Sequence, residues 1–389
     1  MLYEGGLPLA GPADLTGESV AYWRRVRGVL RENRHRLSGV AAALYPDLPR
    51  VGGTDLLCRA EWLPPAPVPL DDVALSWDPG APVPVADGIG PASAHVRPAG
   101  GDYPTYAGAI AELDPPALFE NRPCYRLVRG NLAGEPALDM AMTRYFDAVN
   151  LGHAVAHELA AAWDEPAGRL TMADLPLRAH AGDPCELARR PAMVAVTTLT
   201  LRREPGGTAT FVLHWRDPAK VNHAGGLYQV IPVGLFQPVG ESQAGWVNDF
   251  SLWRCLAREF SEEFLGTSEE YPAPGGVLDY QQWPFYQRLT AARAAGKVTV
   301  HCLGLGVDPL TFATDILSVA VFDSDLYDAM FAGLVTENAE GRVVTVPGSA
   351  GLPFDAATVA RYTGGGEQVQ ASGAAVLTLA WQHRRGLLG

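Results

Sequence analysis

Lysine is almost absent from this chain of 389 residues, and only Lys220 and Lys297 occur among its 30 basic residues. Arginine supplies all the others, while alanine, glycine and proline are abundant. This bias is typical of proteins encoded by GC-rich genomes, for instance actinobacterial ones. The many arginines therefore do not by themselves indicate that phosphate is bound.

Long apolar runs, paired cysteines and excess positive charge are also missing. No run of eighteen apolar residues occurs, which predicts that no segment spans a membrane. The first residues lack the basic and then apolar layout of a signal peptide. Five cysteines, an odd number without any CxxC pair, predict reduced thiols in a cytoplasmic protein, with neither disulfides nor a zinc site. The net charge of −13 argues against a general nucleic-acid binder.

The length suits two domains, and a hydrophobic content of 48% is ample for their cores. We place the boundary near residue 165, between an N-terminal region of unknown role, 1–165, and a C-terminal domain, 166–389. Apolar periodicity predicts one amphipathic helix over residues 17–45 and a second helix over residues 137–163. Residues 60–105 are rich in proline and glycine and hold short strand-like pieces, so we expect an α+β region.

Two features of these helices have a functional and a structural interpretation. The first helix carries six arginines on its polar face, which favours either an anion- or nucleic-acid-binding helix or, as we prefer, a solvated face docked on an acidic protein. In the second helix, His153 and His157 have the i, i+4 spacing of metal ligands. They lack the HExxH order and a third ligand nearby, so a histidine pair without metal is the preferred interpretation.

The most informative segment is Arg258-Glu259-Phe260-Ser261-Glu262-Glu263, which is closed by Gly266. On a helix, positions 259, 262 and 263 share one face, so three carboxylates are crowded together. Trp253, Leu256, Phe260 and Phe264 form an apolar stripe beside them. Like charges this close need a compensating cation, and a hard divalent ion such as Mg²⁺ or Mn²⁺ prefers oxygen ligands.

This segment resembles the core of the Nudix box, the signature of hydrolases that cleave nucleoside diphosphates linked to another group. Upstream, residues 232–241 are similar to the glycine-containing loop that precedes the helix in that family. Six residues separate Gly234 from Glu241 and sixteen separate Glu241 from Arg258, where the family has five and seven, and Gly266 falls one place late. An insertion over residues 242–253 therefore lengthens the loop before the helix or extends the helix backwards.

The resemblance implies a set of site residues. Glu259, Glu262 and Glu263 would hold one or more Mg²⁺ or Mn²⁺ ions, and Arg258 would orient these carboxylates. Gly234 and Glu241 would belong to the loop around the substrate. Arg216 is a candidate phosphate clamp, with a salt bridge to Asp217 or Glu241 as its structural alternative. The general base stays open, with Asp308 and Asp315 as candidates. Tyr228, Phe236 and Trp246 could stack on a base or belong to the core.

The order of elements around the segment favours the same fold. Strand-like runs at 193–201, 208–215 and 227–233 precede a helix that should begin near residues 248–251 and end near Gly266. Asp249 or Ser251 would cap its start, and Gly266 would adopt the left-handed conformation at its end. Further strands are predicted at 298–305 and 317–322. The C-terminal half should therefore be a Nudix-like α/β/α sandwich with a mixed sheet, behind the α+β N-terminal region.

The expected function is metal-dependent hydrolysis of a nucleoside-diphosphate-linked small molecule. Two alternatives stay open: a non-catalytic Nudix-like sensor of a nucleotide or sugar-nucleotide, and a Nudix-fold enzyme repurposed in a specialised pathway. The chain also resembles actinobacterial proteins in which similar sequence follows a helix-turn-helix module, through residues 57–64, 119–126 and 308–311. That resemblance implies a lineage and a regulatory alternative. The oligomeric state, a homodimer included, stays open.

Overall fold

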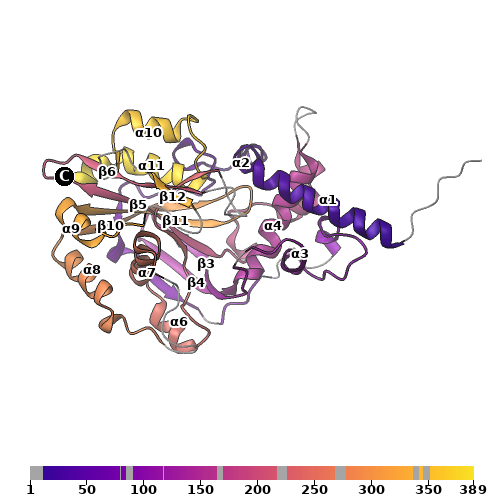
Figure 1. Ribbon diagram of the computed structural model, residues 1–389, viewed down its shortest axis with the longest axis horizontal. Helices are drawn as coiled ribbons and strands as arrows, with labels where there is room; N and C mark the ends of the chain where they lie inside the picture. Colours follow the sequence, from indigo (N-terminus) through magenta and orange to yellow (C-terminus); the bar gives the residue numbers. More distant parts are fainter. Residues whose placement is uncertain are drawn as a thin grey trace, which may run out of the picture.

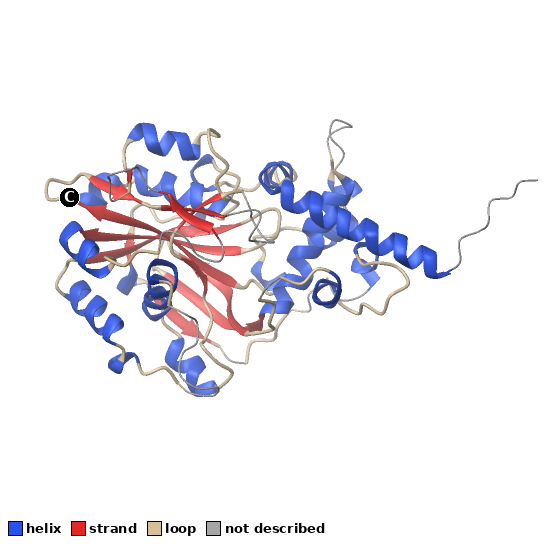
Figure 2. Ribbon diagram, in the orientation of Figure 1, coloured by secondary structure: helices blue, strands red, loops and turns tan. Residues whose placement is uncertain are grey.

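The computed structural model describes residues 12–78, 80–84, 91–116, 118–163, 170–216, 226–267, 277–335, 341–344 and 351–389. Helices and strands are interleaved, and the strands form three sheets (Figure 2). The protein is a mixed α/β chain whose largest sheet contains both parallel and antiparallel neighbours. Within these described residues, no helix is both long and apolar enough to cross a membrane.

The largest sheet has a parallel pair at its centre. β5 (Val194–Arg203) runs parallel to β11 (Thr314–Asp323), and β11 pairs antiparallel with β10 (Val298–Val307). These three strands confirm the strands predicted in the same places. Most of their residues are buried, as expected of strands that are covered on both faces. The shorter strands of this sheet are β1 (Val68–Pro69), β6 (Ala209–Phe211), β9 (Val233–Leu235) and β13 (Leu352–Pro353).

Two of the predicted strands are each divided between two sheets. The run 208–215 contributes β6 to the large sheet and β7 (Leu213–Arg216) to a small one, which also contains β12 (Gly341–Val344). The run 227–233 likewise contributes β8 (Tyr228–Val230) to the small sheet and leads into β9 of the large one. Pro232 lies between β8 and β9, and it has no N–H to donate to a continuous ladder.

Helices cover both faces of the large sheet (Figure 1). On one face, Phe260 of α7 (Leu252–Leu265) contacts Phe322 of β11 with ring centroids 5.3 Å apart. On the other face, Ser372 of α11 (Ala371–Gln382) hydrogen-bonds to Asp315 of β11. Residues 315 and 322 point to opposite sides because side chains alternate along a strand. The other helices of this half are α8 (Pro284–Ala294), α9 (Ser324–Met330), α10 (Ala356–Thr363) and α12 (Arg384–Leu388).

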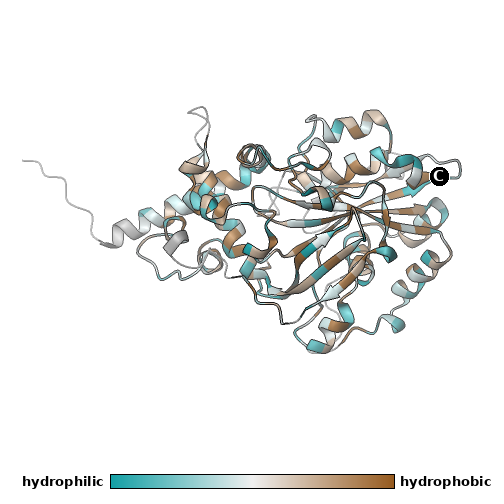
Figure 3. Ribbon diagram, turned by 180° about the vertical axis from the view of Figure 1, so that it is seen from behind, coloured by the Kyte–Doolittle hydropathy of each residue, from teal (hydrophilic) through white to brown (hydrophobic). Residues whose placement is uncertain are grey.

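The N-terminal region is joined to this sheet by strand pairing. Val68 of β1 pairs with Cys302 of β10, and Leu57 forms a bridge with Val307. One continuous hydrophobic core contains buried residues of both halves, and apolar residues gather along the sheet (Figure 3). The boundary near residue 165 stays a prediction. This region contains β2 (Ala74–Trp77), β3 (Pro123–Asn131), β4 (Ala137–Arg144), α3 (Tyr106–Leu113) and α4 (Tyr145–Ala162). In the C-terminal half, α5 (Pro176–Ala181) precedes β5, and α6 (Gln243–Asp249) lies between β9 and α7.

Both helices predicted in the N-terminal region need correction. The first is divided into α1 (Pro12–Glu32) and α2 (Arg34–Ala43), with Asn33 between them. The second begins only at Tyr145, because residues 137–144 form β4 and pair with β2 and β3. Tertiary pairing overrides local helix propensity at this position.

The arginine face of the first two helices is docked in part on carboxylates. Arg27 and Arg31 form ion pairs with Asp114, and Arg34 forms one with Asp308. These contacts agree with the preferred interpretation of a polar face docked on an acidic protein. They also bring α2 to the C-terminal half of the chain.

Candidate functional site

The helix that carries the acidic motif has the predicted boundaries and caps. Its N-cap is Ser251, whose side chain accepts a hydrogen bond from the N–H of Arg254. Its C-cap is Gly266 in the left-handed conformation, with φ at 64°. Leu256, Phe260 and Phe264 are fully buried. The apolar stripe predicted from the sequence therefore fixes which face of α7 its glutamates can present.

The glutamates of α7 meet the strand β9. A Cβ atom placed on Gly234 would lie 1.8 Å from Cδ of Glu259, so the carboxylate occupies the space that any larger residue would fill. The neighbouring Glu263 accepts a hydrogen bond of 2.6 Å from the N–H of Val233 through Oε1. Glycine at position 234, which lies in the strand β9 and not in a loop as predicted, thus allows α7 and β9 to approach closely.

Glu262 lies on the same side of α7 and is half-buried, as are Glu259 and Glu263. Burial raises the pKa of the Cys255 thiol, and the charges of Glu259 and Glu262 raise it further. Cys255 lies one turn before these glutamates on the helix. Of the three glutamates on this face of α7, Glu259 and Glu263 contact β9 directly.

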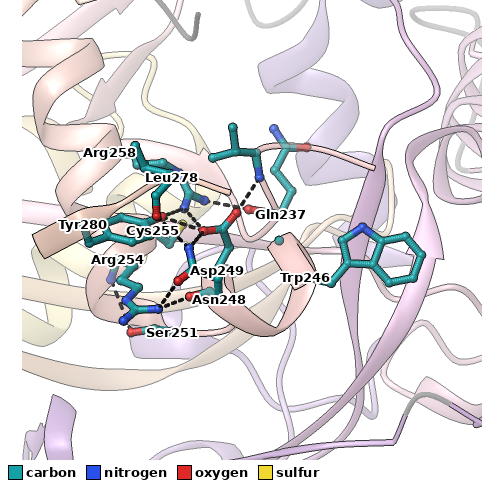
Figure 4. Close-up of polar contacts among 12 residues, drawn as sticks. Gln237, Trp246, Asn248, Asp249, Ser251, Arg254, Cys255, Arg258, Leu278 and Tyr280 are labelled. Atoms are coloured by element: carbon teal, nitrogen blue, oxygen red, sulfur yellow. Dashed lines mark hydrogen bonds and ion pairs between the residues drawn. The ribbon is translucent and has the colours of Figure 1, made fainter. Parts of the chain in front are cut away.

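Arg258 belongs to a buried polar network, which Figure 4 shows. Its guanidinium donates hydrogen bonds to the hydroxyl of Tyr280 and, at 2.6 Å, to the carbonyl of Gln237. It also lies 3.8 Å from Oδ1 of Asp249, which accepts a hydrogen bond of 2.9 Å from Tyr280. The other oxygen of Asp249 accepts the N–H of Val239 at 2.9 Å. This buried network holds the inserted segment, which forms the short helix α6, against α7.

A cavity of about 430 Å³ lies beside Glu263 and unites residues that are far apart in the sequence. Its walls come from α2, from β7 and β8, from the starts of β5 and β11, and from the segment that leads into α11. Glu259, Glu262 and Gly234 do not line it, although Val233 does. The charged and titratable residues that line it are Arg34, His35, Asp55, His214, Arg216, Glu263, Asp308, Asp315 and Glu367.

The two candidates for a general base have different environments in this cavity. Asp308 is held by three donors: Arg34 at 3.1 Å, the hydroxyl of Thr311 at 2.7 Å and the N–H of Leu310 at 3.0 Å. Asp315 accepts a hydrogen bond of 2.6 Å from the hydroxyl of Thr197. Burial raises the pKa of Asp315 to about 7, against the lowering effect of Thr197. Asp315 is therefore the carboxylate that can exchange a proton near neutral pH.

Two buried arginines fix the loop that carries Asp308. Arg178 donates to the carbonyls of Pro309 at 2.5 Å and Leu310 at 2.9 Å, and Arg190 donates to the carbonyl of Phe312 at 2.7 Å. Phe312 has a positive φ of 58°, which is uncommon for a bulky residue and needs such support. The sequence gives no signal for either arginine, because both act on backbone carbonyls far along the chain.

The remaining predicted residues lie at different distances from the cavity. Arg216 lines it at the end of β7, and its alternative partner Asp217 lies outside the described residues. Glu241 is exposed and forms an ion pair of 2.9 Å with Arg144, so it does not belong to the lining. Tyr228 does not line the cavity but packs edge-on against Tyr362, which does, with ring centroids 5.3 Å apart.

Phe236 and Trp246 do not line the cavity either. Phe236 is fully buried and packs 4.4 Å from Tyr125, measured between ring centroids. Trp246 donates its ring N–H to the carbonyl of Gly240 at 3.1 Å. Phe236 therefore belongs to the core, whereas Trp246 is half-buried and contacts the loop before α6.

Sequence reasoning missed Arg34 as a member of this site. It was visible only as one of six arginines on a helix face, and nothing in its spacing separates it from the others. The histidine pair of α4 takes no part. His157 hydrogen-bonds to the hydroxyl of Tyr106 at 3.0 Å, and burial lowers its pKa to about 3. This contact agrees with a histidine pair that has a structural role.

The described part of the chain holds no group of three His, Cys, Asp or Glu side chains arranged to bind a metal ion. Magnesium in proteins is often held by one or two carboxylates and completes its shell with water and substrate phosphates. The carboxylate of Glu259 lies where a Cβ on Gly234 would be, and that of Glu263 accepts the N–H of Val233. Both are oxygen ligands of the type that a hard cation prefers.

No protein-family model matches the chain, and no curated protein matches it at a significant level.

Proposed function

We propose that the protein is a Nudix-like hydrolase that cleaves a nucleoside-diphosphate-linked small molecule in this cavity, with Mg²⁺ or Mn²⁺. The observation that carries the proposal is the contact between α7 and β9. It places Glu259 against Gly234 and binds Glu263 to Val233 at the edge of the cavity. The same cavity is lined by Arg216, the candidate phosphate-binding residue, and by Asp315, a candidate general base; both were predicted from the sequence.

The arrangement of the C-terminal half supports a Nudix-like α/β/α sandwich. A mixed sheet lies between helices, and β9 leads through the inserted segment into α7, which packs back on β9. In this interpretation the insertion is accommodated as the separate helix α6, and α7 keeps its length. The extra residues would thus lengthen the Nudix box before α7, where Arg258 contacts Asp249 at the end of α6.

The residues of the site divide the work of diphosphate hydrolysis. Glu259 and Glu263, with Glu262 on the same helix face, would hold the divalent ion. Such an ion neutralises a diphosphate and lowers the pKa of a bound water. Arg216 would bind phosphate oxygens through its guanidinium, which matches their geometry with two hydrogen bonds.

Asp315 would accept the proton that water loses as it attacks phosphorus, because its pKa of about 7 suits a base at neutral pH. Asp308 and Thr197 would position other groups of the cavity. Asp308 pairs with Arg34, and Thr197 orients the carboxylate of Asp315. Attack of water on one phosphorus would break the P–O–P bond, so the products would be a nucleoside monophosphate and the phosphate ester of the linked group.

A second candidate function is binding without catalysis, as a sensor of a nucleotide or sugar-nucleotide. It is favoured by one observation: no three metal-ligating side chains converge within the described residues. Arg258, which would orient the carboxylates, hydrogen-bonds to Gln237 and Tyr280 and lies near Asp249 of the inserted segment.

A panel of diphosphate compounds separates these functions. Purified protein is incubated with each compound and with Mg²⁺ or Mn²⁺, and release of phosphate or nucleoside monophosphate is measured. Hydrolysis by the wild type that is lost in Glu263→Gln supports the hydrolase. Binding of a compound by calorimetry without any release supports the sensor. If no compound binds and none is cleaved, the cavity does not have this function.

A further inference from the structure

One wall of the cavity is formed by residues 362–374, from the end of α10 to the first turn of α11. It contributes uncharged polar side chains, among them Tyr362 and Gln370, and none of the groups assigned above to metal, phosphate or proton. Backbone hydrogen bonds hold this wall against the small sheet. The N–H of Tyr228 donates to the carbonyl of Gln368 at 2.8 Å, and the N–H of Gln370 donates to the carbonyl of Tyr228 at 2.9 Å. The wall therefore has a fixed position beside β8.

Tyr362 offers its hydroxyl to the cavity rather than the face of its ring. The residue is only 4% exposed. The guanidinium of Arg361 lies over the ring, 5.6 Å from its centroid, and Tyr228 packs edge-on against it. The hydroxyl makes no hydrogen bond with the described residues, and it keeps access to solvent. Because polar groups on buried side chains normally have a partner, this hydroxyl is a position where a ligand can bind.

The amide of Gln370 is held through its oxygen. Nε2 of Gln229 donates to Oε1 of Gln370 at 3.3 Å and to the hydroxyl of Ser372 at 3.2 Å. Oε1 of Gln229 accepts the N–H of Val230 at 3.0 Å, which fixes the orientation of the Gln229 amide. The NH₂ group of Gln370 has no partner among the described residues, and its side chain does not cap α11. This NH₂ group is therefore a second hydrogen-bond donor that a ligand can use.

These two groups match the hydroxyls of a sugar better than a nucleobase. A hydroxyl both donates and accepts, so it can bond to the phenol of Tyr362 in either direction and accept from the amide of Gln370. Proteins recognise nucleobases largely by stacking them on aromatic rings. The ring of Tyr362 is covered by Arg361 and Tyr228, so it leaves no face for stacking.

We propose that Tyr362 and Gln370 form a subsite for the neighbouring hydroxyls of a sugar ring that is attached to the diphosphate. The inference rests on the proposed function for the diphosphate part of the ligand, and it adds the C-terminal segment to the binding site. The ribose of a nucleotide and a sugar linked to it both carry such hydroxyls. The cavity volume of about 430 Å³ is within the usual range for small-molecule sites.

Calorimetric titration of the full chain in the presence of Mg²⁺ tests this inference. The ligands are uncleavable analogues in which a methylene group replaces the bridging oxygen of the diphosphate. They correspond to UDP-glucose, to UDP, and to a UDP whose ribose lacks both hydroxyls. The wild type should bind the first more tightly than the last. Tyr362→Phe keeps the packed ring and should weaken binding of the UDP-glucose analogue roughly 3- to 10-fold, the usual effect of losing one neutral hydrogen bond.

The three analogues also distinguish the two sources of hydroxyls. If the subsite binds the linked sugar, the affinity gap between the UDP-glucose and UDP analogues should shrink in Tyr362→Phe. If it binds the ribose, the gap between the UDP analogue and the one without hydroxyls should shrink instead. Gln370→Met, which removes the amide and no helix cap, should act on the same gap. Either result supports the inference.

Tyr327→Phe is the matched control. Tyr327 is 5% exposed, packs edge-on against Phe264 and lies outside the cavity. Loss of its hydroxyl should leave the affinities for all three analogues unchanged.

The outcomes separate this inference from the proposed function. If neither gap shrinks in Tyr362→Phe or in Gln370→Met, or if the wild type binds none of the analogues, the inference is wrong. Cleavage of the parent compounds by the wild type would then still support the hydrolase. A sugar-dependent affinity that is lost in Tyr362→Phe, without cleavage of any compound in the panel, supports the inference and overturns the hydrolase.

Discussion

The two sides of α7 have contrasting environments, although their polar residues are adjacent in the sequence. Arg258 is buried and contacts Gln237, Tyr280 and, in the inserted segment, Asp249. Glu259 and Glu263 are half-buried and meet β9 at the edge of the cavity. One short motif thus combines an arginine that holds a buried network with carboxylates that contact a neighbouring strand. Substitutions on the two sides should therefore change different quantities.

The largest expected effect is on stability, from Arg258→Met. This change removes the cation from a buried group and leaves Asp249 without its counter-charge. Loss of one partner of a buried pair costs about 3 kcal/mol or more of unfolding free energy. Chemical denaturation measures the change, and the exposed Arg288→Met should cost less than about 0.5 kcal/mol. A loss below about 1 kcal/mol for Arg258→Met would show that the network does not hold α7.

A smaller effect, on metal binding, is expected from Glu263→Gln. In the wild type, Mg²⁺ or Mn²⁺ at a hundred times its dissociation constant should stabilise the folded state by about 2.7 kcal/mol. Glu263→Gln keeps an oxygen that can accept from Val233 but removes a charge, so this stabilisation should be lost while the apo protein stays folded. Glu262→Gln should act in the same direction. Thermal unfolding at increasing metal concentration measures the effect.

Two controls belong to the metal prediction. Glu120→Gln, at an exposed residue that pairs with Arg122, should keep the full metal response. Replacement of His153 and His157 by alanine should also keep it, because these histidines are expected to have no part in the site. An unchanged response in Glu263→Gln would separate α7 from any metal site.

Gly234→Ala tests the contact between β9 and the glutamates of α7. The added Cβ would collide with the carboxylate of Glu259, which is the mobile end of a long side chain. The carboxylate can move away, so we expect a stability cost of about 1 kcal/mol, at the low end for overpacking, and a clear loss of metal affinity. Gly240→Ala, where a Cβ meets no atom within 4 Å, should change neither quantity. Equal metal affinity in both variants would contradict a role for Glu259.

The effect of Asp315→Asn is expected to depend on pH. The folded-state pKa of Asp315 is raised to about 7 from an ordinary value of 3.8, so the folded state holds a proton that the unfolded state loses between these values. The contribution of Asp315 to the unfolding free energy is therefore fully present below pH 4 and is lost as the pH rises through 7. The slope is at most about 1.4 kcal/mol per pH unit.

Denaturation of both proteins between pH 4 and 8 measures the difference. The wild type should lose stability relative to Asp315→Asn as pH rises. A constant difference across this range would mean that Asp315 does not titrate there. Any hydrolytic activity of the wild type should rise through the same range, because the ionised carboxylate is the form that accepts a proton.

The parts of the structure that the sequence predicted are those set by local pattern. The apolar stripe of α7, with Ser251 before it and Gly266 after it, fixed both ends of the helix. The continuous apolar runs of β5, β10 and β11 likewise indicated buried strands. In each of these cases the signal lies within about fifteen neighbouring residues.

The parts that could not be predicted depend on long-range contacts. Residues 137–144 form a strand only because β2 and β3 pair with them, and Arg34 reaches the cavity only because α2 docks on the loop of Asp308. The role of Arg258 was also hidden, since its partner Asp249 lies in the insertion that broke the expected spacing. Of the candidate site, the acidic helix was predicted, whereas its cavity was not.

The central claim is that Glu259 and Glu263 hold a divalent ion next to a diphosphate in this cavity. A crystal structure with Mn²⁺ and a non-hydrolysable diphosphate compound tests it most directly, since manganese is located by its anomalous signal. We predict one manganese peak bound by Glu259 and Glu263 beside Gly234, with phosphate oxygens at Arg216. Manganese bound elsewhere, or a diphosphate that occupies another surface, would contradict the account.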